Sequence, residues 1–498
     1  MQDLIRQPGS RFMALLVFCL YIWAGAVAAA DYNLPQLGEP ANAALSPAEE
    51  ERLGARVVAQ LLQGNHILED TELQAYLRQV GQQLLQASDR DASDFHFFAV
   101  RDGSINAFAL PGGHIGVNTG LLTETDSESE LAGVMAHEIA HVTQRHIARQ
   151  FQATKGTQWA SLAALLAAAL LSGGDGDVME AAITGSISMS HQQSLGFTRA
   201  HEAEADHVGI RRLAAAHFDP NAMATFFGKL QRRSRLYGQQ PPQILLSHPV
   251  TTTRIAEARA RAEDYPALRV RESTDYALMK ERARVLATAQ YGELLRYYRN
   301  VGAPDNGNPA DTYGYALTLM RSGAASQAVE LLQALAQEHA EQFHYVTALA
   351  EAQKMAGQPQ AAEATLQQAL SRFGDKPALV LQYAGLLLAN NQPQAARALL
   401  KRHPSLVASN DRAQEILAEA AGKQDRLGEA YYHQAQYFRM RGAYVPAIRR
   451  LRTVLHRNQL GSVDRDRLNA LLGQIIRDCN RAWSERECRQ RVLDRSLD

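Results

Sequence analysis

Residues 127–143 read SESELAGVMAHEIAHVT and contain a His-Glu-x-x-His pattern formed by His137, Glu138 and His141. Apolar residues recur here at intervals of three and four, which predicts a helix from about 127 to 150. They are Leu131, Val134, Met135 and Ile139. Because residues four apart share one helix face, the imidazoles of His137 and His141 can bind the same zinc ion. Glu138 lies beside a ligand and can take a proton from an attacking water without binding the metal.

A catalytic zinc needs a third protein ligand, and the acidic stretch HEAEAD at 201–206 contains several candidates. Glu202 and Asp206 are four apart, so Glu202 could bind the metal while Asp206 supports a ligand histidine from behind. Glu204 faces elsewhere. The alternative is that these carboxylates form a solvated helix face.

The whole chain has the composition of a globular protein. Its 498 residues are 46% hydrophobic and 21% charged, which excludes collagen-like, disordered and polytopic membrane chains. Such a length predicts roughly two to four domains. The 51 Lys and Arg nearly balance the 52 Asp and Glu, so no concentrated basic surface favours a nucleic-acid partner.

The N-terminus has the pattern of a cleaved export signal. Arg6 and Arg11 precede an apolar run, and small residues follow it up to Ala30. Residues 1–30 are therefore predicted to be a signal peptide. An uncleaved anchor is the alternative, although the run is shorter than the ~20 residues of a membrane span. Beyond it, Cys479 and Cys488 could form one disulfide or remain free thiols.

Two helices and a small sheet are expected before residue 127. Residues 46–49, Ser-Pro-Ala-Glu, form a capping box with proline at the first helical position, so a helix should follow. A second helix is predicted by an apolar stripe that consists of Leu73, Tyr76, Leu77, Val80 and Leu84. Aromatic and β-branched residues, with a Pro-Gly-Gly turn at 111–113, predict a small sheet over 95–118.

The stretch from Trp159 to Leu171 is strongly apolar. As a helix it would span at most about 20 Å, short of the ~30 Å hydrocarbon core, so it could touch a membrane but hardly cross one. Glycine and aspartate follow at 173–177, and then a polar run reaches Gln193. The segment from Trp159 to Gln193 could be a lid, or a buried helix followed by a surface loop.

The C-terminal half repeats itself. Gly323, Gly357, Asn391 and Gly442 each occupy a turn, and the first three are spaced by 34 residues. Alanine recurs seven residues before and five after each turn, and leucine nine after it: Ala316, Ala350, Ala384, Ala435; Ala328, Ala362, Ala396, Ala447; Leu332, Leu366, Leu400, Leu451. This pattern is typical of tetratricopeptide repeats, with a generic helical bundle as the alternative. The longer gap before Gly442 predicts an extra helix or irregular repeat around 405–425.

Four spaced motifs together resemble those of the M48 family of zinc metallopeptidases. They are HEIAH at 137–141, Glu202-x-x-Ala205-Asp206, NAFALPGG at 106–113, and Ser247-His248-Pro249 with Arg254-Ile255. The resemblance covers about residues 45–265. It implies a mainly α (α+β) zincin-type domain that binds one Zn²⁺ per chain. By this resemblance His137, His141 and Glu202 are the zinc ligands, and Glu138 is the catalytic base.

His248 has three possible roles. Close to the metal, it could be catalytic and stabilise the oxyanion of the reaction, or it could fill the fourth coordination position and silence the enzyme. Alternatively, His248 and Pro249 simply start a helix. His146 follows His141 by five residues, which turns it away from the metal and predicts a surface or structural role.

A substrate-binding edge is expected next to the zinc. Gly112 and Gly113, with the strand through Ile115 and Val117, would let an extended peptide add to the sheet. Backbone hydrogen bonds would then dominate binding, which predicts low sequence specificity.

The signal peptide and the repeats make the chain similar to exported M48 members of Gram-negative bacteria. The predicted domains are a signal peptide (1–30), the metallopeptidase domain (31–265), a helical linker (266–310), an α-helical tetratricopeptide solenoid (311–457) and a C-terminal helical cap (458–498). The resemblance implies a periplasmic endopeptidase in quality control of outer-membrane β-barrel proteins. Its partners would be unfolded or misassembled outer-membrane proteins and the β-barrel assembly machinery.

The main alternative is a non-enzymatic periplasmic chaperone or scaffold with a latent or structural zinc site. Glu138 argues against it, because a structural site has no need of a carboxylate beside its ligands.

Overall fold

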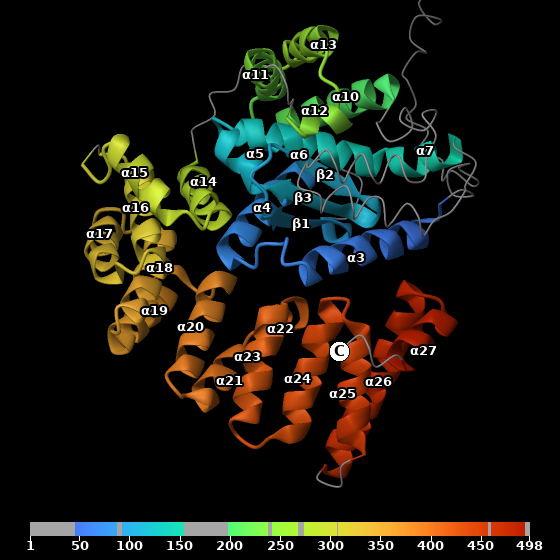
Figure 1. Ribbon diagram of the computed structural model, residues 1–498, viewed down its shortest axis with the longest axis vertical. Coiled ribbons are helices and arrows are strands. Elements are labelled where there is room, and N and C mark those ends of the chain that lie inside the picture. Colours follow the sequence, from blue (N-terminus) through green and yellow to red (C-terminus); the bar gives the residue numbers. More distant parts are fainter. Residues whose placement is uncertain are drawn as a thin grey trace, which may run out of the picture.

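The computed structural model describes residues 45–86, 92–153, 198–237, 242–266, 273–305, 307–456 and 460–493. The fold is mainly α with one small sheet, as predicted. An N-terminal part holds the sheet between helices, and an arc of paired helices curves beneath it (Figure 1). The predicted signal peptide at 1–30 and the segment from Trp159 to Gln193 lie outside the described residues. Within the described ranges, no helix combines the length and the hydropathy that crossing a bilayer requires.

The sheet predicted over 95–118 is present and has three strands. They are β1 (His96–Val100), β2 (Ala107–Leu110) and β3 (His114–Asn118), in the order β1-β3-β2. β2 and β3 are antiparallel and are joined by the 3-10 turn η2 (Pro111–Gly113), whereas β1 runs parallel to β3. β3 is therefore the central strand, with a partner on each side.

This order overturns the prediction that the strand through Ile115 and Val117 is an open edge. Ile115 pairs with Phe97 on one side and with Ala109 on the other, so its backbone has no side left for a peptide. Among the residues that the structure describes, β2 is instead an outer strand of the sheet, and it lies along the helix that carries the His-Glu-x-x-His pattern.

Gly112 and Gly113 also have a different role from the predicted substrate edge. Both have positive φ, of +76° and +82°. A Cβ on Gly112 would lie 2.6 Å from the Glu51 Cα, and one on Gly113 would lie 2.0 Å from the Asp94 carbonyl oxygen. The two glycines therefore let η2 pack closely against α3 (Pro47–Gln63) and the residues before β1.

The predicted N-terminal helices are confirmed. α3 begins at the capping box, where the Glu49 carboxylate accepts hydrogen bonds from the Ser46 backbone N–H and hydroxyl. α4 (Thr71–Leu85) buries the whole predicted stripe. α5 (Thr119–Glu124) follows β3, and the Ser127 side chain then caps α6 (Glu128–Thr143).

The helix expected from 127 to about 150 is broken. α6 ends at Thr143, Arg145 has a φ of 53°, and a new helix, α7 (His146–Ala153), begins there. A left-handed residue cannot continue a right-handed helix, so α7 leaves in another direction.

The described residues of the N-terminal part also form α10 (Arg199–Ala215), α11 (Ala222–Tyr237), the short α12 (Ile244–Ser247) and α13 (Thr252–Ala262). α10 packs along α6. At this contact a Cβ on Gly209 would lie 3.3 Å from the His137 backbone nitrogen, so the glycine permits the two backbones to approach closely. That approach brings the acidic stretch of α10 to the histidines of α6.

The repeats are confirmed as paired helices. The four predicted turn residues all have positive φ, and the alanines and leucines of the repeat pattern are buried. Around 405–425, where an extra helix or an irregular repeat was expected, the structure has two helices, α22 and α23. The bounds are α14 (Thr274–Ala287), α15 (Tyr291–Asn300), α16 (Pro309–Arg321), α17 (Ala325–Glu338), α18 (Phe343–Met355), α19 (Pro359–Phe373), α20 (Pro377–Ala389), α21 (Pro393–Lys401), α22 (Pro404–Ser409), α23 (Asp411–Gly422), α24 (Leu427–Met440), α25 (Tyr444–Leu455), α26 (Ser462–Ala482) and α27 (Glu485–Leu493). A disulfide between Cys479 and Cys488 joins α26 to α27.

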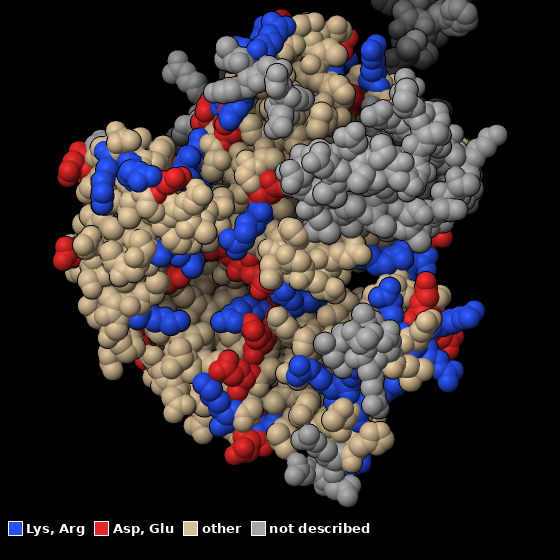
Figure 2. Space-filling view, in the orientation of Figure 1, with Lys and Arg blue, Asp and Glu red and all other residues tan. Residues whose placement is uncertain are grey.

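Charged side chains connect the repeats to the N-terminal part. Figure 2 shows both signs of charge gathered where the two parts meet. Glu72 of α4 is buried and pairs with His344 of α18 and with Arg282 of α14, whose guanidinium also donates two hydrogen bonds of 2.8 Å to Asp70. Further along the arc, Arg441, which follows α24, pairs with Glu69 at 2.6 Å.

Glu72→Gln is expected to loosen this junction in a pH-dependent way. Burial raises the pKa of Glu72, but Arg282 and His344 outweigh it and lower the pKa to about 2. The folded state thus binds this proton less tightly than the unfolded state, so the stabilisation is present above about pH 4.5 and disappears as the pH falls towards 2. We expect the variant to lose about 3 kcal/mol of unfolding free energy at pH 7. In denaturant titrations at a series of pH values, its unfolding free energy should fall less steeply towards low pH than that of the wild type. Equal stability of the two proteins at pH 7 would contradict the role of this network.

Candidate metal centre

Three helical elements bring the predicted site residues together. His137 and His141 project from one face of α6, Glu202 comes from α10, and His248 lies directly after α12. All four side chains are buried, and each offers one ligand atom within 4.8 Å of the others. Residues separated by up to 111 positions in the sequence therefore converge on one point.

The separations of these atoms suit a metal ion. The Nε2 atoms of His137 and His141 lie 3.0 Å apart, and each is 3.5 Å from an oxygen of Glu202. Ligand atoms at tetrahedral zinc, bound at 2.0–2.1 Å, are separated by roughly 3.3 Å. Two imidazole nitrogens and a carboxylate are also a donor set that divalent transition metals prefer. The residues present therefore fit such an ion.

Glu138 lies next to this cluster without belonging to it. Its side chain is fully buried, and neither carboxylate oxygen has a hydrogen-bond partner among the described residues that meets ordinary geometry. The nearest ion-pair contact is His248 Nε2, at 3.6 Å from Oε1. Burial raises the pKa of Glu138, although His248 and His137 oppose the shift. A buried carboxylate with a raised pKa beside a histidine cluster has the properties of a general base.

Asp206 and Arg254 hold two of the site side chains in place. The Asp206 carboxylate lies 3.0 Å from Nδ1 of His137, on the side of the ring away from the cluster. Arg254 of α13 donates two hydrogen bonds of 2.8 Å to Asp206, contacts Glu202 at 2.8 Å and bonds the carbonyl of Pro249. Burial opposes the ionisation of Glu202, but His248 and His137 hold its pKa well below the usual range. Through its contacts with Asp206 and Glu202 on one side and with Pro249 on the other, Arg254 fixes α10 relative to the segment that carries His248.

His146 was expected to turn away from the metal and to have a surface or structural role. It does not belong to the ligand cluster, but the surface role is wrong, because its side chain is completely buried and its Nδ1 lies 2.9 Å from Nδ1 of His141. The break at Arg145 produces this contact, because α7 does not continue the direction of α6. Burial lowers the pKa of His146 to about 4, so its ring is neutral at pH 7. No local pattern in the sequence predicted this break.

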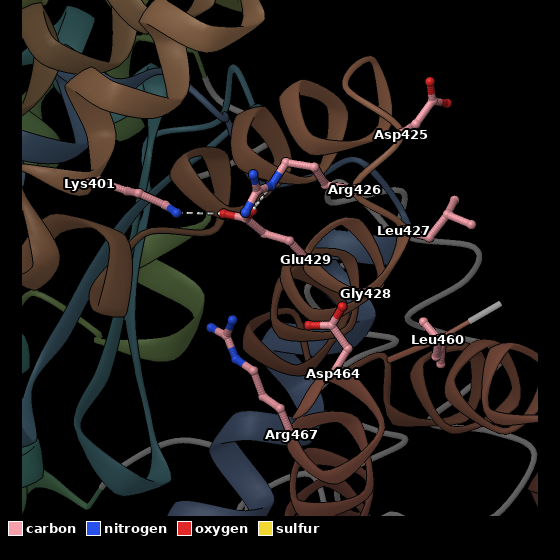
Figure 3. Close-up of a pocket in the computed structure, with 9 residues that line it drawn as sticks. All are labelled: Lys401, Asp425, Arg426, Leu427, Gly428, Glu429, Leu460, Asp464 and Arg467. Carbon is pink, nitrogen blue, oxygen red and sulfur yellow. Dashed lines mark hydrogen bonds and ion pairs between the residues drawn. The ribbon is translucent and has the colours of Figure 1, made fainter. Parts of the chain in front are cut away.

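The repeats contain a cavity apart from the metal centre. A cavity of about 310 Å³ is lined by residues of α21, α24 and α26 and their flanking turns. Figure 3 shows Lys401 and Arg426 converging on Glu429, and Arg397 also pairs with this carboxylate at 2.8 Å. Burial raises the pKa of Glu429, but these cations outweigh the effect of burial and lower the pKa to about 2. The cavity thus presents paired charges of both signs.

The fold and the buried cluster define a metallopeptidase domain followed by tetratricopeptide repeats. Residues 71–262 match the model of peptidase family M48, and residues 355–420 match a tetratricopeptide repeat. The chain is 31% identical to the β-barrel assembly-enhancing protease of Escherichia coli K12 over 477 residues, which cover 95% of this chain and 97% of that one. The chain therefore belongs to peptidase family M48.

Other relatives show how far the similarity extends. The β-barrel assembly-enhancing protease of Yersinia pestis is 31% identical over 89% of this chain and 92% of its own length. The mitochondrial metalloendopeptidase OMA1 of Schizosaccharomyces pombe is 31% identical over 36% of this chain and 50% of its own length. The longer similarity thus includes the repeats, whereas the shorter one covers about a third of the chain.

Proposed function

We propose that this metallopeptidase is a zinc-dependent endopeptidase of the periplasm that acts in the assembly and quality control of outer-membrane β-barrel proteins. The observation that carries the catalytic part is the buried cluster of His137, His141 and Glu202 with Glu138 beside it. The export-signal pattern of residues 1–30 supports the location, and the names of relatives that match nearly the whole chain support the substrates.

Each residue of the site has a role in this proposal. His137, His141 and Glu202 would hold one Zn²⁺, with Asp206 supporting His137. When bound, zinc supplies the Lewis acidity that polarises a peptide carbonyl and acidifies water. Glu138 takes the proton of the attacking water and passes it to the leaving amine. An extended substrate would pair with β2, an outer strand that lies along α6.

The repeats would bind substrates or the β-barrel assembly machinery. Their cavity at Lys401, Arg426 and Glu429 contains positively and negatively charged side chains, of which Glu429 is buried. The buried junction around Glu72 joins the repeats to α4 of the peptidase domain, so a partner bound to the arc is held at a fixed place relative to the site.

His248 is proposed to fill the fourth coordination position in the conformation described here. Its Nδ1 lies 2.9 Å from Glu202 Oε1 and 3.3 Å from His137 Nε2, within the ligand cluster. A substrate carbonyl or a water needs this position, so His248 must move before cleavage. This geometry favours the blocking role over the alternative in which His248 only starts a helix.

His248→Ala is therefore expected to increase proteolysis. If the blocked state accounts for about 90% of molecules, its removal raises the cleavage rate by about 10-fold. The assay follows cleavage of an outer-membrane β-barrel protein that has been unfolded in urea and diluted, with the same protein folded in detergent micelles as the control. Zinc content is measured in parallel.

The outcomes separate the parts of the proposal. Faster cleavage of the unfolded barrel, with the folded barrel resistant and zinc retained, agrees with it. A large loss of activity in His248→Ala with zinc retained would show that His248 assists the reaction. Equal cleavage of folded and unfolded barrels would contradict the quality-control function.

A further inference from the structure

We infer that His146 is a positioning residue for His141. It is the first member of a hydrogen-bond chain that continues to Glu204 and Arg149. The inference rests on the proposed role of His141 as a metal ligand. His146 Nδ1 lies 2.9 Å from His141 Nδ1, its Nε2 lies 3.2 Å from Glu204 Oε2, and Arg149 Nη1 lies 2.9 Å from the same oxygen. The His146 side chain is completely buried, and the charged end of the chain is partly exposed.

The direction of the hydrogen bonds follows from the ligand role of His141. Its Nε2 faces His137 and Glu202, so that nitrogen must carry the lone pair and Nδ1 must carry the proton. Nδ1 of His141 therefore donates to Nδ1 of His146. The proton of His146 is then on Nε2 and is donated to the Glu204 carboxylate, whose Oε2 also accepts a hydrogen bond from Arg149 Nη1. Each group in the chain has the one tautomer or charge that its neighbour requires.

The two ligand histidines are thus held in a similar way from opposite sides. Nδ1 of His137 meets Asp206, and that carboxylate is held by Arg254. Nδ1 of His141 reaches its arginine-held carboxylate, Glu204, through the ring of His146. The acidic stretch of α10 therefore divides its functions: Glu202 faces the cluster, and Asp206 and Glu204 each anchor one histidine.

This arrangement predicts that His146 controls metal affinity. Outer partners of a metal-binding histidine fix its ring and raise its basicity, and their loss typically weakens metal binding by 10–100-fold. Leucine at 146 would fill the space without accepting a hydrogen bond. Asparagine places a carbonyl oxygen near the position of the histidine Nδ1 and can still accept from His141, whereas glutamine places its amide further out, near the position of Nε2.

The test measures zinc affinity of the full mature chain by competition with a chromophoric chelator, together with the visible spectrum of the Co²⁺ form. We expect His146→Leu and His146→Gln to bind zinc 10–100-fold more weakly and to shift the Co²⁺ bands, and His146→Asn to recover most of the affinity. Thermal unfolding of the metal-free proteins serves as the control for folding. If His146→Leu fails to fold, the zinc affinities of His146→Asn and His146→Gln still test whether His146 positions His141.

Glu202→Ala in the same assay separates this inference from the proposed function. Wild-type affinity and an unchanged Co²⁺ spectrum in His146→Leu, with metal lost in Glu202→Ala, would overturn the positioning role alone. Equal weakening by Asn and Gln would overturn it as well. Full zinc binding by Glu202→Ala would instead overturn the metal site on which the inference rests.

Discussion

Glu138→Gln is expected to lower kcat/KM for peptide cleavage by about 10²–10⁴-fold while zinc stays bound. Glutamine has nearly the same shape as glutamate but cannot take a proton from water, so the variant loses the general base and little else. Glu138 lies outside the ligand cluster, which is why metal binding should persist. The measurement is cleavage of an unfolded β-barrel protein, followed by gel densitometry, with zinc content determined on the same preparations.

A matched control lies on the same helix. Glu130 is also buried in α6, but its carboxylate accepts a hydrogen bond from the Asp126 backbone, and glutamine can accept the same bond. Glu130→Gln should keep wild-type cleavage. Intact cleavage by Glu138→Gln would contradict the mechanism. Loss of cleavage with retained binding of substrates to the repeats would show that any chaperone role is separate from the peptidase.

Glu202→Ala is expected to release the metal and to abolish cleavage. The carboxylate is one of three proposed ligands, so its loss should weaken zinc binding by more than the 10–100-fold typical of an outer partner. The measurement is zinc per chain after dialysis against a weak chelator. We expect about one zinc per chain in the wild type and almost none in the variant.

A second substitution guards against misfolding. Removal of Glu202 leaves the buried Arg254 with one partner fewer, which itself destabilises the fold. Glu202→Gln keeps the size of the side chain and a hydrogen-bond acceptor but not its charge, and it should also lose zinc affinity. Glu257→Ala on α13, an exposed carboxylate that pairs with Arg261 and does not belong to the cluster, is the control that should retain zinc. Zinc retained by both Glu202 variants would exclude Glu202 as a ligand.

Local and periodic features could be predicted from the sequence. The spacing of Ala316, Ala328 and Leu332 relative to Gly323 recurs in each repeat, because paired helices need small residues where they cross and a turn between them. The same holds for the face shared by His137 and His141, since four residues make about one helical turn.

Features that depend on tertiary packing could not be predicted. The three strands were visible as apolar segments, but their order was not, and Ile115 was therefore assigned to an edge although β3 is central. His146 was placed away from the metal because the helix was assumed to continue through Arg145. The pair of Glu72 with His344 joins residues 272 positions apart, and nothing near either residue in the sequence indicates the other.

Anomalous diffraction tests the central claim most directly. Crystals of the mature protein, purified without added metal, would be measured on both sides of the zinc absorption edge. We predict one anomalous peak per chain, present only above the edge, between Nε2 of His137, Nε2 of His141 and the carboxylate of Glu202. The absence of a peak in protein exported to its native compartment, or a peak held by other residues, would contradict the proposed site.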